Sequence, residues 1–378
     1  MSNETVSAKT QTSAQKYQAI KNRLFLFNLC LEFSFLIIFV VSGASLFLRA
    51  RLEELGGSFF SLNALYSACF GSLAFFLSLP LEFYEGFILE HRFGLSRESG
   101  FAWLKDALKK AVISFFIFLV MVEAVYYFLL RFPGIWWLCA ALFWFFVTVI
   151  LAKISPHWIL PLFFRPTPLP EGPLKERIMA FLSRYPVSCK KVSVLNFSKK
   201  TVKANALVAG LGATKEIFLS DTLVQEFTPD EIEVVLAHEI GHYVHRDTFK
   251  LIGVNLLVTV ISFFITSIFF NRLVVFFGLN GVSDVAALPL LLLSFIFLSM
   301  ILLPAQNGMA RFLEHEADVF SVDATKNAAA FISVMKRLGE KNLSEFSPPK
   351  IKEIFLYDHP HLSKRIAWAE SLLASKNS

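Results

Sequence analysis

Three residues within one short stretch could do chemistry together: His238, Glu239 and His242, in the pattern H-E-x-x-H. On an α-helix, residues four apart share one face, so the two imidazoles can converge on a single metal ion. The carboxylate of Glu239 would then reach a water molecule held by that ion. An amphipathic helix with two surface histidines is the alternative, because a five-residue pattern also arises by chance. The rest of the chain therefore has to support the metal assignment.

The helix that carries this pattern has a recognisable beginning. Thr228 can cap its first turn, and Glu231, three residues later, completes a capping box. Upstream, two short β-branched and apolar runs, 190–197 and 215–220, flank a Gly-rich stretch and predict a small β-sheet. A helix over 174–184 is predicted to precede that sheet, after an extended Pro-rich segment.

A catalytic zinc site usually takes three protein ligands and leaves one position for water. A third histidine in the pattern H-E-x-x-H-x-x-G-x-x-H is excluded, because His245 and Thr248 stand where its glycine and last histidine would be. The best candidate is Glu314, which shares a helical face with Asp318. Glu314 could bind zinc while Asp318 accepts the outer N–H of a ligating histidine. The alternative is a solvated charged face. Against it, the segment directly follows the apolar stretch 286–305, which is long enough to span a membrane, and enters the same side of that membrane as His238.

These groups together suit the hydrolysis of a peptide bond. Zinc lowers the pKa of a bound water to about 7 and polarises a carbonyl group. Glu239, which is not a ligand in this scheme, takes the proton from the water and later passes it to the leaving amine.

The composition places this chemistry in a membrane protein. The chain has 378 residues, of which 55% are hydrophobic and 43 are Phe, and no C-x-x-C pattern that would indicate a cysteine metal site. Its formal charge of +6 is explained by basic residues beside membrane spans rather than by nucleic-acid binding. A bilayer requires about 20 apolar residues per helix. Six stretches qualify: 24–48, 59–83, 111–130, 134–154, 251–270 and 286–305.

The positive-inside rule sets the orientation, because the polar regions and the second connection are basic while the remaining loops are short. Six spans with both termini in the cytoplasm satisfy every connection. The predicted organisation is a disordered cytoplasmic tail at 1–23, four membrane helices within 24–154, a cytoplasmic catalytic part at 155–250 with the H-E-x-x-H helix, two membrane helices within 251–305, and a second cytoplasmic catalytic part at 306–378.

Several segments in order give the chain a specific resemblance. They are LPLEFYEGFILEHRFGLSRES, ISPHWILPLFFRPTPLPEGPLKERI, KANALVAGLGATKEIFLSDTLV, HEIGH, EHEAD and YDHPHLSKRI, between Leu79 and Ile366. In these the chain resembles the type I CAAX prenyl endopeptidases, integral-membrane zinc proteases of the gluzincin group. The resemblance implies an α-helical polytopic membrane protein that could enclose a chamber, with a cytoplasmic α+β gluzincin-type zinc protease portion. Family members have seven spans; this sequence has six, and the missing one is at the N-terminus.

The resemblance also implies roles at matching positions: one Zn²⁺ per chain bound by His238, His242 and Glu314, catalysis by Glu239, His359 and Asp318, and substrate binding by Asn205, Ala206 and Arg365. Asn205 and Ala206 would lie on a strand that holds the substrate as an added strand. His359 and Arg365 would approach the oxyanion of the tetrahedral intermediate. A packing or helix-capping histidine is the alternative for His359.

The predicted function is that of a membrane zinc endopeptidase acting on peptide or protein substrates, among them prenylated CAAX peptides, in contact with membrane lipid and without nucleic acid. One alternative is a quality-control protease without prenyl dependence. Another is a non-catalytic metal-binding scaffold or channel, against which Glu239 argues, because binding zinc does not require that residue. The expected location is the inner membrane of a bacterium, or the endoplasmic reticulum membrane if the source is eukaryotic.

Overall fold

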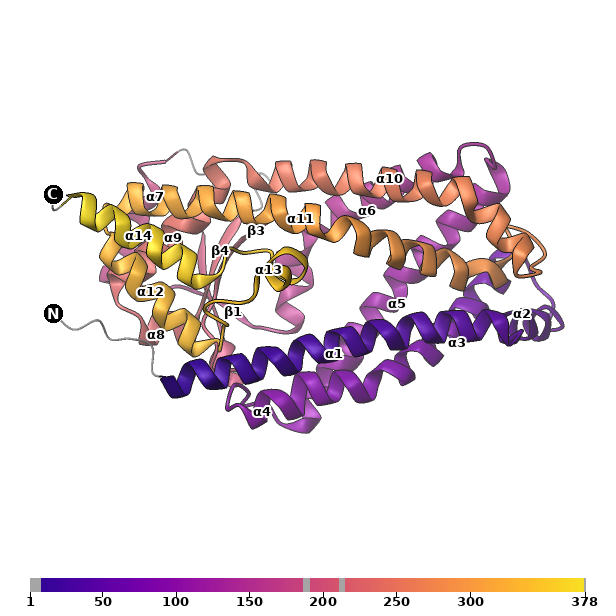
Figure 1. Cartoon of the computed structure of the whole chain (residues 1–378), viewed down its shortest axis with the longest axis horizontal. Helices are drawn as coiled ribbons and strands as arrows, with labels where there is room; N and C mark the ends of the chain where they lie inside the picture. The colour runs from indigo at the N-terminus through magenta and orange to yellow at the C-terminus, as the bar shows by residue number, and fades with distance from the viewer. Residues whose placement is uncertain (1–7, 186–190, 211–214, 377–378) are drawn as a thin grey trace.

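Six long apolar helices form one half of the molecule, which a computed structural model describes for residues 8–185, 191–210 and 215–376. The helices lie side by side, and the catalytic part caps one end of them (Figure 1). The predicted number of spans is confirmed among the described residues. Their helices are α1 (Ala8–Val41), α3 (Phe59–Phe83), α5 (Gly100–Arg131), α6 (Trp136–Trp158), α10 (Asp247–Phe276) and α11 (Leu288–Thr325).

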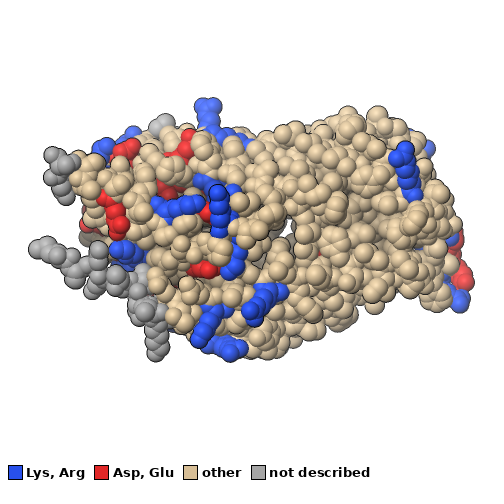
Figure 2. Space-filling view, in the orientation of Figure 1, with Lys and Arg blue, Asp and Glu red and all other residues tan. Residues whose placement is uncertain are grey.

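The distribution of charged side chains also separates the membrane helices from the catalytic part. Charged side chains gather over the catalytic part and at the opposite tip of the molecule, and a broad band of uncharged side chains covers the helices between them (Figure 2). Backbone groups in hydrocarbon have to be satisfied within the chain, which these continuous helices achieve. The protein is therefore an integral membrane protein.

All six helices continue past their apolar segments toward the catalytic end (Figure 1). Span six and the segment of Glu314, which the sequence analysis divides near 305, form the single helix α11. Pro304 lies inside α11 without ending it, as prolines in membrane helices often do. Helix α10 likewise begins at Asp247, three residues before the predicted division at 250. As a result, the membrane helices carry site residues directly.

The disordered tail predicted for 1–23 is wrong from Ala8 onward; residues 1–7 lie outside the described residues. Helix α1 begins at Ala8 and runs without a break into the membrane. Ala14 and Tyr17 are only 2% and 1% exposed. This short apolar contact cannot be recognised in the sequence, because the residues around it are polar and two buried residues three apart are too few to form an amphipathic pattern.

The first span also ends earlier than predicted, at Val41. Gly43 turns the chain with φ 77°, which glycine adopts without steric cost. The short helix α2 (Ala44–Glu53) follows at the tip of the membrane half. At the other end, α3 continues through the π-helical turn 84–89 into α4 (Glu90–Arg92).

The catalytic part contains a four-stranded sheet in the order β1-β2-β4-β3. Strands β2 and β4 are parallel, and the outer pairs are antiparallel. The predicted small sheet is confirmed, and β3 lies at its edge. Its strands are β1 (Pro166–Pro168), β2 (Val192–Leu195), β3 (Ala206–Ala209) and β4 (Glu216–Ser220).

Helices enclose this sheet and share one apolar core with it. The predicted helix at 174–184 is confirmed as α7. The helices of the catalytic part in this core are α7 (Pro173–Leu182), α8 (Asp221–Glu226), α9 (Pro229–Val244), α12 (Ala328–Lys341) and α14 (Leu362–Lys376), whereas α13 (Lys350–Leu356) packs against α11.

Helix α9, which carries H-E-x-x-H, begins with the predicted capping box. Thr228 Oγ1 accepts a hydrogen bond from the Glu231 N–H at 3.3 Å, and a Glu231 carboxylate oxygen accepts one from the Thr228 N–H at 2.9 Å. The same carboxylate also binds Ser333 at 2.7 Å and pairs with Arg337, both on α12. One buried side chain therefore caps α9 and ties it to its neighbour.

Candidate active site

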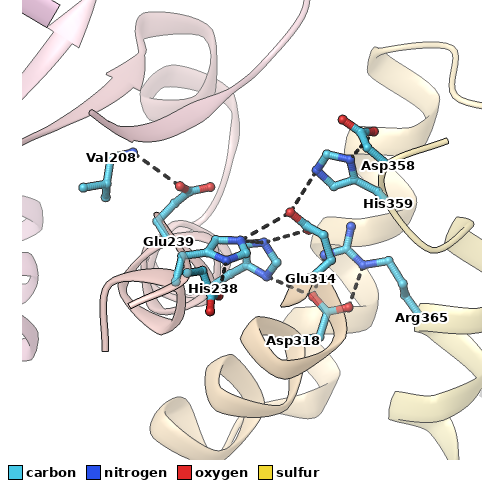
Figure 3. Close-up of polar contacts among 10 residues, drawn as sticks. Val208, His238, Glu239, Glu314, Asp318, Asp358, His359 and Arg365 are labelled. Carbon is cyan, nitrogen blue, oxygen red and sulfur yellow. Dashed lines mark hydrogen bonds and ion pairs between the residues drawn. The ribbon is translucent and has the colours of Figure 1, made fainter. Parts of the chain in front are cut away.

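The three predicted metal ligands converge from two helices. His238 projects from α9 toward Glu314 of α11 (Figure 3), and His242 follows one turn later on the same helix. Each imidazole Nε2 lies 3.3 Å from an oxygen of Glu314, and the two Nε2 atoms are 3.3 Å apart. One donor atom from each of the three residues falls within 4.8 Å of the others. This arrangement suits two nitrogen ligands and one oxygen ligand around a single ion.

Two further observations fit a cation at this point. Among the described residues, the buried Oε2 of Glu314 makes no hydrogen bond of acceptable geometry, although His238 Nε2 lies 3.3 Å from it, and such an atom is costly to leave unsatisfied. Burial alone would lower the pKa of His238, but Asp318 and Glu314 raise it to about 9. The site thus attracts a positive charge, which a bound metal ion would supply in place of a proton.

Each histidine is oriented by a buried carboxylate. His238 Nδ1 lies 3.0 Å from Asp318, and His242 Nδ1 lies 2.9 Å from Asp247. Both acids are at most 1% exposed. A carboxylate on one ring nitrogen leaves the other nitrogen available to a metal.

Asp247 was not predicted from the sequence. It stands five residues after His242, beyond the end of α9, and Arg246 between the helices adopts φ 58°. This left-handed residue turns the chain so that Asp247 reaches back to the ring. A polar residue just past the second histidine was the only signal in the sequence.

Glu239 faces the edge of the sheet. Its Oε2 accepts a hydrogen bond from the N–H of Val208 on β3 at 3.3 Å (Figure 3). Burial raises the pKa of Glu239, and a carboxyl group whose pKa is raised toward neutrality suits proton transfer. The outer edge of β3 is therefore turned toward the carboxylate next to the metal ligands.

A cavity of about 370 Å³ opens in front of these groups. It lies between the edge strand, α9 and the segments around α12 and α14. Seven of the nine predicted site residues line it: Asn205, Ala206, His238, Glu239, Glu314, His359 and Arg365. His242 and Asp318 are not among the lining residues. The structure thus brings together segments that lie about 150 residues apart in the sequence.

Two family models together match nearly the whole chain. Residues 2–165 match the CAAX prenyl protease N-terminal model, described as five membrane helices, and residues 168–373 match peptidase family M48. The chain belongs to peptidase family M48. With its membrane helices, this M48 peptidase is a membrane metalloendopeptidase of the CAAX prenyl protease family, as the resemblance in its sequence predicts.

Relatives of this M48 peptidase occur in bacteria and eukaryotes. It is 31% identical to an uncharacterized metalloprotease, YhfN, of Bacillus subtilis, covering 94% of this chain and 84% of the relative. It is 29% identical to CAAX prenyl protease 1 of Saccharomyces cerevisiae, covering 79% and 71%, and 27% identical to the human CAAX prenyl protease 1 homolog, covering 82% and 72%. The crystal structure of S. mikatae Ste24p has the same fold, with a TM-score of 0.87, 22% identity, and coverage of 97% of this chain and 90% of that one.

The membrane helices of this peptidase differ in one detail from the description of the N-terminal family model. Over the matched residues 2–165, the described part of the chain contains four helices long enough to span a membrane, together with the short α2. Cavities of about 520 Å³ and 270 Å³ adjoin one another between the membrane helices, because both are lined by Phe70, Phe75 and Leu292.

Gly241 allows the two ligand-bearing helices of the M48 peptidase to approach. A Cβ atom at this position would lie 3.1 Å from Cα of Ala317 and 3.2 Å from the ring of Phe320, both on α11. Few real Cβ atoms have contacts this short, so a larger residue would push α9 away from α11. The glycine within HEIGH is therefore explained by helix packing.

His359 and Arg365 occupy different positions relative to the ligands. His359 Nε2 lies 3.2 Å from Glu314 and its Nδ1 lies 2.7 Å from Asp358. Burial alone would lower the pKa of His359, but these two carboxylates raise it to about 10, so the ring carries positive charge at the cavity wall. Arg365 instead donates two hydrogen bonds to Asp318, at 2.7 and 2.5 Å. It supports the carboxylate behind His238, and its predicted contact with substrate stays a prediction.

Proposed function

We propose that this membrane metalloendopeptidase is a zinc enzyme that cleaves prenylated C-terminal CAAX peptides at the cytoplasmic face of the membrane. The observation that carries the zinc assignment is the donor set of two imidazoles and one carboxylate, with a second carboxylate beside it that is not a ligand. Zinc accepts these nitrogen and oxygen donors and is bound by three protein ligands in catalytic sites. One zinc ion per chain is expected, held by His238, His242 and Glu314.

Individual residues of the chain have separate roles in catalysis and substrate binding. When bound, zinc supplies Lewis acidity that activates water and polarises a carbonyl group. Glu239 takes the proton from the attacking water and passes it to the leaving amine. Strand β3 pairs with the substrate backbone through its outer edge, beside the cavity that Ala206 and the preceding residue Asn205 line. The charged ring of His359 faces the negative charge that develops on the carbonyl oxygen.

Two observations support a prenylated substrate. Relatives in yeast and human are named CAAX prenyl protease 1 and its homolog. In addition, the membrane half contains the cavity of about 520 Å³, whose lining includes Phe70, Phe75, Phe115, Phe116 and Phe118. An apolar chain attached to a peptide would be sheltered from water in such a space.

The test compares a prenylated CAAX peptide with its unprenylated twin, using the purified full chain with and without a zinc chelator. We expect the prenylated peptide to be cleaved with a kcat/KM at least about tenfold higher, which corresponds to about 1.4 kcal/mol of transition-state binding. Chelator should abolish cleavage, and added zinc should restore it. Equal cleavage of both peptides would instead support a quality-control protease without prenyl dependence, and chelator-resistant cleavage would contradict the zinc assignment.

The cytoplasmic orientation rests on the basic residues of the catalytic end and on the short loops at the opposite tip. In a bacterium the membrane would be the inner membrane, and in a eukaryote that of the endoplasmic reticulum. A reporter fused after Ser378 should be active only in the cytoplasm. A signal from the outer side would reverse the topology.

A further inference from the structure

We propose that the first turns of α1 and the amide of Asn342 form a clamp that positions edge strand β3 for substrate binding. The clamp consists of Tyr17, Gln18 and Asn342, none of which contacts the three metal ligands through a hydrogen bond or ion pair that the structure records. The inference rests on the proposed peptide hydrolysis, because it assigns these residues to the binding of the peptide substrate.

Asn342 holds the backbone immediately before β3. Its Oδ1 accepts a hydrogen bond from the Ala204 N–H at 3.1 Å, and its Nδ2 donates one to the Ala204 carbonyl at 3.1 Å. The next residue, Asn205, exchanges hydrogen bonds with Ser220 through its N–H at 3.0 Å and its carbonyl at 2.9 Å. A side-chain amide thus pairs with both backbone groups of Ala204, as a neighbouring strand would. The entry to the substrate strand is fixed on both sides.

Asn342 is itself held in place by α1. It follows the last residue of α12, and Leu343 after it adopts φ 49°. A left-handed leucine persists only where its surroundings fix it. Leu343 is 9% exposed, and its carbonyl accepts a hydrogen bond from Gln18 Nε2 at 3.0 Å. Helix α1 therefore stabilises the turn that presents the Asn342 amide to Ala204.

Tyr17 provides a second attachment for the same strand entry, through Lys203. Its hydroxyl donates to Glu90 and accepts from Lys203 Nζ at 3.2 Å, while Lys203 Nζ lies 2.7 Å from Glu90. Lys203 directly precedes Ala204. The Tyr17 ring is 1% exposed and packs in a small apolar cluster that includes Leu343. The first turns of α1 lie beside α12 at the catalytic end (Figure 1).

These contacts connect a membrane helix to the strand that would bind the peptide. Ala204, Asn205, Ala206 and Asn342 all line the cavity in front of the metal ligands. Loosening the strand entry should cost peptide binding, because the strand must be ordered before it can pair with an extended substrate. The metal site and the proton transfer by Glu239 should be affected little. Asn342 is therefore a positioning residue.

The test replaces Asn342 in the full chain and follows the cleavage of an extended peptide. Asn342→Ala removes two hydrogen bonds and should raise KM about tenfold, with kcat within about threefold of the wild type. Asn342→Asp keeps the acceptor for the Ala204 N–H and should give an intermediate KM. The matched control is Asn280→Ala at the far tip of the membrane half, where the amide binds Asp284; it should change neither constant.

A double-mutant cycle tests the contribution of α1. Gln18→Ala should raise KM by about threefold in the wild type and have no further effect in the Asn342→Ala background, because both substitutions release the same turn. Independent, multiplicative effects would contradict the coupling. An unchanged KM in Asn342→Ala, or a fall in kcat together with metal loss, would overturn the positioning role.

Hydrogen exchange provides a readout that does not depend on activity. Asn342→Ala should accelerate exchange of the backbone amides at 204–208, while those of α9 keep their wild-type protection. Unchanged exchange at 204–208 would overturn the clamp even if the wild-type chain cleaves peptides. If the wild-type chain cleaves no peptide, the proposed function fails, and the exchange result alone decides whether the clamp holds the strand.

Discussion

Glu239→Gln should lower kcat for peptide cleavage by about 10³-fold, within the range that general acid–base groups contribute. Glutamine retains an oxygen that can accept the hydrogen bond from Val208, so the shape of the site is preserved. It cannot take a proton from water, and that step would be lost. Cleavage of a peptide by the purified variant, measured together with its zinc content, checks the prediction.

The zinc content should stay near one per chain, because Glu239 is not among the three residues that converge on the metal position. Glu233→Gln on the same helix, where the carboxylate pairs with Arg177 of α7 and is not among the residues that line the cavity, is the matched control and should keep its activity. Undiminished cleavage by Glu239→Gln would remove the acid–base role from this residue. Loss of zinc would instead indicate a structural effect.

Glu314→Ala should lose zinc and, with it, cleavage. The substitution removes the only carboxylate among the three converging residues, and it leaves two histidines that face each other across 3.3 Å. Removing residues that merely support a ligand costs about 10–100-fold in metal affinity, so loss of the ligand itself should exceed 100-fold. Metal content after dialysis against a weak chelator measures this directly.

Asp323→Ala is the matched control for this variant. Asp323 lies on the same helix and pairs with Lys326 at the surface, so its loss should change neither zinc content nor cleavage. A Glu314→Ala variant that keeps its zinc and cleaves at the wild-type rate would show that the third ligand is another residue.

Local spacing in the sequence predicts much of this protein. The capping box at Thr228, the face shared by His238 and His242, and the six apolar runs all depend on residues a few positions apart. These features are reproduced in the structure because helix geometry alone determines them. Glu314 could be proposed only by combining its spacing to Asp318 with the membrane topology.

Features that depend on tertiary contact were not predictable in this way. The continuity of α11 through Pro304 contradicts the usual reading of proline as the end of a helix. The start of α1 at Ala8 depends on the burial of Tyr17 against distant segments. The contact of Asp247 with His242 depends on a left-handed turn at an arginine, for which the sequence carries no clear signal.

Helices α9 and α11 together are proposed to bind one zinc ion. An anomalous difference map collected at the zinc absorption edge from crystals of the full chain tests this proposal most directly. We predict one peak per chain, within about 2.0–2.2 Å of Nε2 of His238, Nε2 of His242 and a carboxylate oxygen of Glu314. A peak elsewhere in the chain, or one whose ligands exclude Glu314, would contradict a zinc site between α9 and α11.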